Sequence, residues 1–159
     1  MSTVKLASAA LLLAAISLAL SGSPAYAHDQ HVTFSAGAPG NPKARSRVIV
    51  VTMKEGDGKM LYVPDRIEVR RGEQIRFMLQ NVGELDHEFL LATTEENLKH
   101  GELMKKYPEM EHDDPNGKRL APRAKSEIIW RFTKKGEFEF GCLIPGHREA
   151  GMVGKIIVK

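Results

Sequence analysis

The stretch FEFGCLIPGHREAGM, residues 138–152, begins with the alternation of a β-strand and continues into a loop. Successive side chains of a strand point to opposite faces, so Phe138, Phe140 and Cys142 share one face. We expect that face to be the interior, with the thiol at the end of the strand above two aromatic rings. Pro145-Gly146 predicts a tight turn, because proline fixes one φ angle and glycine tolerates the next.

Two more potential ligands follow the thiol at equal intervals. His147 comes five residues after Cys142, and Met152 comes five residues after His147, at the start of a final apolar run. The chain must reverse direction between the two strands, which brings the ends of this loop together. We therefore predict that the thiol, the imidazole and the thioether line one end of the protein.

A histidine far upstream has the same inward parity. His87 alternates with Phe89 and Leu91, just after the turn-forming run Asn81-Val82-Gly83-Glu84. This pattern predicts a further strand whose first inward side chain is an imidazole.

The four side chains together form a donor set with a specific chemistry. Two imidazoles, one thiolate and one thioether are the ligands of a trigonal blue copper site, in which Met is the weak axial ligand. The predicted metal ligands are therefore His87, Cys142, His147 and Met152. The predicted cofactor is one type 1 copper ion per chain.

Other uses of the thiol fit the sequence less well. A dinuclear copper site needs a second cysteine in the loop, and the chain has only one. A multicopper oxidase needs histidines beside the cysteine, where Gly141 and Leu143 stand. Structural zinc prefers four Cys or His ligands. A Cys–His nucleophile pair leaves the inward His87 and Met152 without a role.

The rest of the chain is mostly β-structure with one helical interruption. Alternating or β-branched runs occur at 48–51, 67–69, 75–79, 87–91, 128–132, 138–140 and 153–159. Turn-forming residues separate them, which favours an antiparallel sandwich or barrel. Thr93-Thr94-Glu95-Glu96 has the form of a capping box and predicts a helix over 95–106. The Pro- and Gly-containing segment 109–124 predicts an irregular loop.

The N-terminal segment has the pattern of an exported protein. Residues 1–27 combine one Lys, an apolar run and a terminal Ala25-Tyr26-Ala27, which predicts a signal peptide cleaved after Ala27. The apolar run is shorter than the roughly 20 residues of a membrane anchor. We expect a flexible arm over 28–45 and one domain over 46–159.

Charge and cysteine content narrow the functional classes. The 23 basic and 20 acidic residues are interspersed, which gives no nucleic-acid-binding signature. A lone cysteine in an exported chain cannot form an internal disulfide, and an exposed thiol is a liability in an oxidising compartment. The thiol is therefore buried and inert, or it is held by a metal.

The spacing Cys-x₄-His-x₄-Met, with one histidine far upstream, resembles that of the cupredoxins, especially azurin and rusticyanin. YVPDRIEVRRGEQIRFMLQN, residues 62–81, is similar to their strand pair with the pattern Pro-x-x-Ile-x-Val-x-x-Gly. The resemblance covers 46–159 and implies an all-β, Greek-key β-sandwich with a short helical insert and the same four copper ligands. The insert and MEHDDPN, residues 110–116, resemble a periplasmic subgroup sometimes linked with copper tolerance.

The residue after the first ligand departs from the family pattern. Many cupredoxins have Asn or Ser there, whose side chain donates a hydrogen bond near the thiolate. This chain has Glu88, which donates nothing when ionised. Because such outer groups tune the metal, the reduction potential is expected to differ from that of those cupredoxins.

A copper ion with four protein ligands has no open position for a substrate, which argues against an enzyme. We predict a periplasmic one-electron carrier that cycles between Cu(II) and Cu(I). The resemblance implies an apolar docking patch over 143–146 around the edge of His147, suited to brief contacts. It also implies a c-type cytochrome or terminal oxidase as partner. We expect a monomer with no nucleic-acid partner and no stable membrane insertion after cleavage.

The alternative function is copper tolerance, by sequestration or delivery, with the same ligands. Additional copper at His28 with His31, or at Met110 with His112, would favour it. Each pair offers only a partial ligand set, and ordering its backbone would cost about 1–2 kcal/mol per residue. We therefore predict one tight copper ion per chain.

Overall fold

The computed structural model describes residues 33–108 and 114–159. The predicted signal peptide over 1–27 lies outside the described residues. So do all four candidate ligands for additional copper: His28, His31, Met110 and His112. Within the described ranges, no helix is both long enough and apolar enough to cross a membrane.

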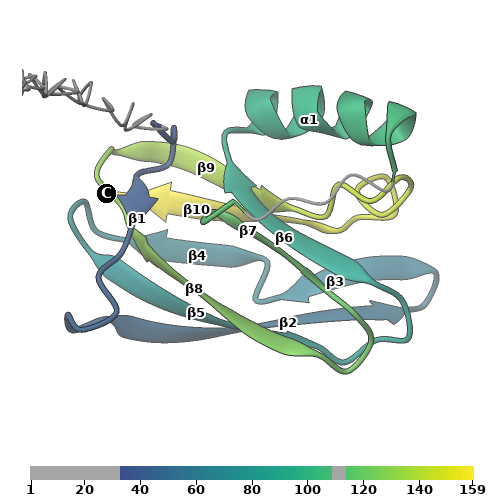
Figure 1. Ribbon diagram of the computed structural model, residues 1–159, viewed down its shortest axis with the longest axis horizontal. Helices are drawn as coiled ribbons and strands as arrows, with labels where there is room; N and C mark the ends of the chain where they lie inside the picture. Colours follow the sequence, from purple (N-terminus) through teal and green to yellow (C-terminus); the bar gives the residue numbers. More distant parts are fainter. Residues whose placement is uncertain (1–32, 109–113) are drawn as a thin grey trace, which may run out of the picture. The chain divides into compact units, whose positions relative to one another are not determined.

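The described strands form two five-stranded sheets that pack as a sandwich (Figure 1). The first sheet has the order β1-β8-β5-β2-β3. Its strands are β1 (Ala38–Pro39), β2 (Arg47–Gly56), β3 (Lys59–Val63), β5 (Gln74–Asn81) and β8 (Lys125–Arg131). Strands β2 and β5 pair in parallel, and the other neighbours in this sheet are antiparallel.

The second sheet has the order β4-β10-β9-β6-β7. Its strands are β4 (Arg66–Val69), β6 (His87–Ala92), β7 (Gly117–Leu120), β9 (Gly136–Gly141) and β10 (Val153–Val158). Only β4 and β10 pair in parallel here. This architecture confirms the predicted all-β sandwich.

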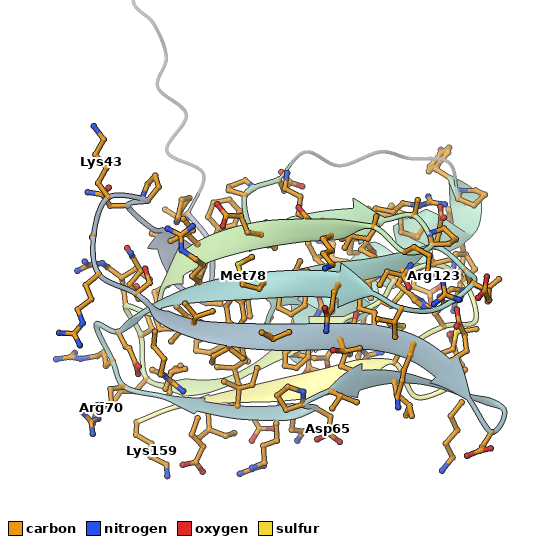
Figure 2. All side chains as sticks on the ribbon, turned by 90° about the horizontal axis from the view of Figure 1, so that it is seen from below. Lys43, Asp65, Arg70, Met78, Arg123 and Lys159 are labelled. Carbon is orange, nitrogen blue, oxygen red and sulfur yellow. The ribbon has the colours of Figure 1, made fainter. Side chains whose placement is uncertain are left out.

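The alternation read from the sequence sets the inner faces of both sheets. In β5, Phe77 and Leu79 are buried, whereas Met78 between them is exposed on the outer face of the first sheet. Figure 2 shows this face, with Met78 on β5 and with Arg70 and Arg123 toward opposite ends of the sandwich.

Aromatic rings fill the interior beneath the candidate ligands. Phe89 of β6 stacks on Phe140 of β9 with ring centroids 5.0 Å apart, and Tyr62 meets Phe140 edge to face at the same separation. Burial of each such ring contributes about 1.5–3 kcal/mol. The strand ends that carry the ligands therefore pack against a closely packed group of aromatic rings.

The predicted helix is present as α1 (Thr94–Lys106). Thr93 caps it, and Glu96 completes the capping box by accepting a bond from the Thr93 backbone N–H. Figure 1 shows α1 on the outer face of the second sheet. Met104 of α1 packs there with Leu90 of β6 and Leu143. Strand β6 is consequently buried on both faces.

The prediction of a flexible arm over 28–45 is wrong for its described part, 33–45. Strand β1 pairs with β8, and Phe34 contacts Trp130 edge to face at 5.2 Å. The Trp130 indole N–H donates to the carbonyl of fully buried Ala36. Gly37 lies so near β8 that a Cβ atom would come 2.1 Å from the Arg131 carbonyl oxygen. The glycine thus serves a close approach rather than flexibility.

The prediction of an irregular loop over 109–124 is also incomplete. Strand β7 lies within it and pairs antiparallel with β6. The strand has a weak sequence signal because it is only four residues long, forms an edge, and carries Lys118 and Arg119 in its middle. Gly117 permits the close approach, since a Cβ atom there would lie 2.7 Å from Leu90 Cδ1.

Candidate metal centre

Three of the four predicted ligands lie at adjacent strand ends in the second sheet. His87 is the first residue of β6, Cys142 follows the last residue of β9, and Met152 precedes the first residue of β10. Strands β10, β9 and β6 are neighbours in that order. His147 lies in the loop that joins β9 to β10. Sheet pairing therefore brings residues 55 positions apart (142 − 87) to the same end of the sandwich.

Backbone hydrogen bonds tie three of these residues together within the loop. The Cys142 N–H donates to the Met152 carbonyl at 3.2 Å, and the Met152 N–H donates to the His147 carbonyl at 3.1 Å. The predicted turn is present, because the His147 N–H donates to the Ile144 carbonyl and Gly146 has a φ angle of +89°. The loop is thus closed on itself through its candidate ligands.

Three donor atoms converge at this end of the sandwich. The Nδ1 atoms of His87 and His147 are 3.3 Å apart, and Cys142 Sγ lies 3.4 Å from His147 Nδ1. All three donors lie within 4.8 Å of one another, and no other such His, Cys, Asp and Glu group occurs in residues 33–108 and 114–159. Donors in a trigonal plane at bond lengths of about 2.0–2.3 Å, as for zinc, have similar separations. The geometry fits one metal ion.

The donor types select the metal. A thiolate with two imidazoles suits copper in both oxidation states, because sulfur favours Cu(I) and imidazole binds either. Met152 is fully buried just before β10, in keeping with the weak fourth ligand of a type 1 site. Its axial role stays a prediction.

Comparison with known proteins agrees with this chemistry. Residues 49–159 match the family described as copper binding proteins, plastocyanin/azurin family. The chain belongs to that family, the cupredoxins. It is 46% identical over 135 residues to the copper-resistant cuproprotein CopI of Rubrivivax gelatinosus, covering 85% of this chain and 79% of the relative. The protein of the same name from Pseudomonas aeruginosa is 32% identical, covering 98% and 97%.

Solved structures support the fold of this cupredoxin. Auracyanin from Roseiflexus castenholzii superposes with a TM-score of 0.59 at 19% identity, covering 73% of this chain and 99% of that one. Auracyanin B gives a TM-score of 0.62 at 15% identity, covering 78% and 96%. At these identities the likeness concerns architecture alone.

The thiol of this cupredoxin accepts a hydrogen bond from the backbone. The Glu88 N–H donates to Cys142 Sγ at 3.3 Å, and the Glu88 carboxylate accepts from the Leu143 N–H at 3.1 Å. Tyr62 fixes the same residue, because its hydroxyl donates to the Glu88 carbonyl. The glutamate that departs from the family pattern thus bridges the two ligand-bearing segments as an acceptor.

Burial keeps the donors of the metal-free site uncharged at neutral pH. It raises the pKa of the Cys142 thiol to about 12 and lowers the pKa values of both His87 and His147 below their usual value. The neighbouring His87 lowers the pKa of His147 further. A metal ion must therefore displace the thiol proton when it binds.

Two carboxylates next to the ligands were not predicted from the sequence. Glu55 of β2 lies beside His87, and Glu139 of β9 binds Arg148, the residue after His147. Alternation places Glu139 on the outer face of its strand, but it is buried there. Neither residue belongs to a recognisable sequence motif. Glu139 lies in β9 of the second sheet, whereas Glu55 comes from the first sheet and is held beside His87 by the loop that precedes it.

Proposed function

We propose that this cupredoxin serves copper tolerance by binding one copper ion at His87, Cys142, His147 and Met152. The observation that carries the proposal is the buried group of two imidazoles and one thiol in a chain 46% identical to a copper-resistant cuproprotein. A buried, softly coordinated ion is withheld from other thiols and from solvent, which is what sequestration requires.

The same arrangement leads us to expect no enzymatic activity. Four protein ligands would leave no coordination position for a substrate, and catalytic metal centres normally keep one open. The donors are also enclosed, since His87 and Cys142 are fully buried and His147 is 9% exposed. The site is suited to holding a metal rather than to transforming a ligand.

Electron transfer is the second candidate function. A closed His₂Cys site on a rigid sandwich limits rearrangement between Cu(II) and Cu(I), which favours one-electron exchange. A c-type cytochrome or a terminal oxidase remains the expected partner for that role, through the apolar residues 143–146. The two functions use the same ligands. Electron transfer requires a reduction potential that suits the partner, whereas sequestration requires only tight binding.

The location that suits either role is the periplasm. We expect export with cleavage after Ala27, so that the mature chain begins at His28. Mass spectrometry of periplasmic protein tests this, and a mass that retains residues 1–27 would contradict it.

Growth in copper separates the two functions. A host strain that lacks the gene should become copper-sensitive, and the wild-type chain should restore growth. Cys142→Ser should fail, because it removes the thiolate. Met152→Leu should restore growth fully if binding suffices, since the axial bond is weak. Met78→Leu is a matched control, because Met78 lies on the outer face of the first sheet.

The growth results distinguish copper tolerance from electron transfer. Restoration by Cys142→Ser would overturn the proposal altogether. A Met152→Leu protein that holds copper but fails to protect the strain would instead favour a role that depends on the potential. Titration of the mature chain with Cu(I) and Cu(II) should give one tight ion. A second tight ion would show that the described site is only part of the binding capacity.

A further inference from the structure

Glu55 reaches His87 from outside the ligand loops. It lies near the end of β2, and its Oε1 atom is 2.9 Å from His87 Nε2, the ring nitrogen that faces away from the other donors. The His87 side chain is fully buried, whereas that of Glu55 is 27% exposed. In residues 33–108 and 114–159, Nε2 has no hydrogen bond of regular geometry. The Glu55 carboxylate nevertheless places an acceptor oxygen 2.9 Å from that nitrogen.

The loop before His87 is built around this carboxylate. Oε2 of Glu55 accepts from the Glu84 N–H at 3.1 Å, and Oε1 accepts from the Leu85 N–H at 2.9 Å. Gly83 leaves room for the carboxylate, because a Cβ atom there would lie 2.2 Å from Oε2. Two peptide donors and one glycine thus fix a negative charge at the outer edge of the His87 ring.

A fixed acceptor at Nε2 decides where the imidazole proton resides. A carboxylate at that distance favours the tautomer with its proton on Nε2, which leaves the Nδ1 lone pair directed toward His147 Nδ1 and Cys142 Sγ. A carboxylate on the outer nitrogen of a ligating histidine orients the ring and makes it a stronger donor. A stronger donor stabilises Cu(II) more than Cu(I).

We propose that Glu55 is a positioning residue for the copper centre, which fixes the tautomer of His87 and biases the bound metal toward Cu(II). The inference rests on the proposed copper site but not on a role in tolerance. Its chemical signature is a change in relative affinity for the two oxidation states, which a purely structural residue would not produce.

The test compares three variants of Glu55 with a matched control. Glu55→Ala removes the acceptor, Glu55→Gln removes the charge, and Glu55→Asp keeps the charge on a shorter side chain. Glu84→Gln is the control, because Glu84 belongs to the same loop as the groups that hold Glu55. Its side chain is 77% exposed and pairs with Arg123 rather than with His87. The probes are Cu(I) and Cu(II) ions, each buffered by a competing chelator.

Loss of the outer partner should weaken Cu(II) binding by about 10- to 100-fold in Glu55→Ala, with a smaller change for Cu(I). A tenfold fall in the Cu(II)-to-Cu(I) affinity ratio raises the reduction potential by about 59 mV. Glu55→Gln should shift in the same direction by less, and Glu55→Asp should recover part of the loss. Nitrogen NMR of the metal-free protein should show the His87 proton on Nε2 in the wild type.

Each outcome has a separate meaning. A wild-type chain that binds no copper would sink the proposed function and this inference together. Folded Glu55→Gln and Glu55→Ala proteins with the affinities and potential of Glu84→Gln would overturn this inference alone. Equal losses for Cu(I) and Cu(II) would also contradict it, because they would assign Glu55 to support of the loop rather than to the metal.

Discussion

Two carboxylates flank the candidate copper centre, and they differ in what they touch. Glu55 contacts the ring of His87 directly and is partly exposed, at 27%. Glu139 touches neither histidine and is 5% exposed; its carboxylate binds the Arg148 guanidinium and accepts from Asn97 of α1. The first can alter the metal through its ligand. The second joins the ligand loop to the helix, so its effect should appear in folding stability.

The largest expected effect comes from removing the centre that both carboxylates flank. Cu(II)-loaded wild-type protein should have an intense sulfur-to-copper charge-transfer band in the visible spectrum. Cys142→Ser should abolish it, because the band requires the thiolate. His87→Ala should disrupt the same band from another strand. A band that survives Cys142→Ser would contradict the assignment of the thiolate as a copper ligand, because the chain has no second cysteine.

The next largest effect tests the contribution of Glu139 to folding stability. Glu139→Leu removes the carboxylate that pairs with the Arg148 guanidinium, which is 21% exposed, and leaves the Asn97 amide with only the Leu90 carbonyl as acceptor. Removing one partner of a buried pair costs about 3 kcal/mol or more, measured by denaturant unfolding of the metal-free protein. The charge-transfer band of the folded, copper-loaded variant should be retained.

A double variant sharpens that result. Glu139→Leu combined with Arg148→Met should recover most of the lost stability, because an apolar pair can replace a buried ion pair at little cost. Loss of the band in a folded Glu139→Leu protein would contradict the division of roles, since both carboxylates would then act on the metal.

Copper affinity should depend on pH through the thiol. The pKa of Cys142 is raised to about 12, and those of His87 and His147 are lowered. At neutral pH, binding then releases one proton, and affinity rises about tenfold per pH unit. This dependence should persist up to the thiol pKa, and protons on the imidazoles should steepen it in acid. Affinity independent of pH near 7 would mean that the thiol is already ionised.

A smaller effect is expected at the axial position. Met152→Leu should retain copper and its band, because the thioether bond is long and weak. Its reduction potential should rise, since removing a donor disfavours Cu(II). Electrochemistry of the loaded variant measures the shift, and loss of copper would identify Met152 as a stronger ligand than proposed.

The smallest effect provides the baseline for Glu139. Glu137 lies two residues earlier in β9 and pairs with Lys155 on the exposed surface. Exposed ion pairs contribute little to the free energy of unfolding, because water and salt screen them. Glu137→Gln should therefore leave the unfolding midpoint and the copper spectrum within error of the wild type. A loss comparable to that of Glu139→Leu would show that burial is not what distinguishes the two glutamates.

The sequence predicted those features whose information is local. Alternation in β9 identified the inward face of Cys142, and the capping box at Thr93 identified the start of α1. The five-residue spacings after Cys142 then identified His147 and Met152, because the loop between two strands must bring its ends together. Alternation with Phe89 identified His87. The assignment to copper followed from donor chemistry rather than from any distance.

Other features could not be predicted because competing local patterns were stronger. Strand β1 lies in a segment rich in Gly and Pro, and β7 carries Lys118 and Arg119 in its middle. Each forms because an existing sheet edge offers unpaired backbone groups. A segment's own composition says little about whether such an edge is available.

The sequence by itself therefore determined the β-class, the helix and the donor types of the candidate centre, since periodicity and side-chain chemistry are properties of neighbouring residues. Only the tertiary structure decided which groups surround those donors. Glu55 meets His87 across 32 positions of sequence (87 − 55), and Asn97 meets Glu139 across 42. These contacts depend on strand order and on where α1 covers the second sheet, and a carboxylate in an alternating strand has the same local pattern whether it faces water or a ligand.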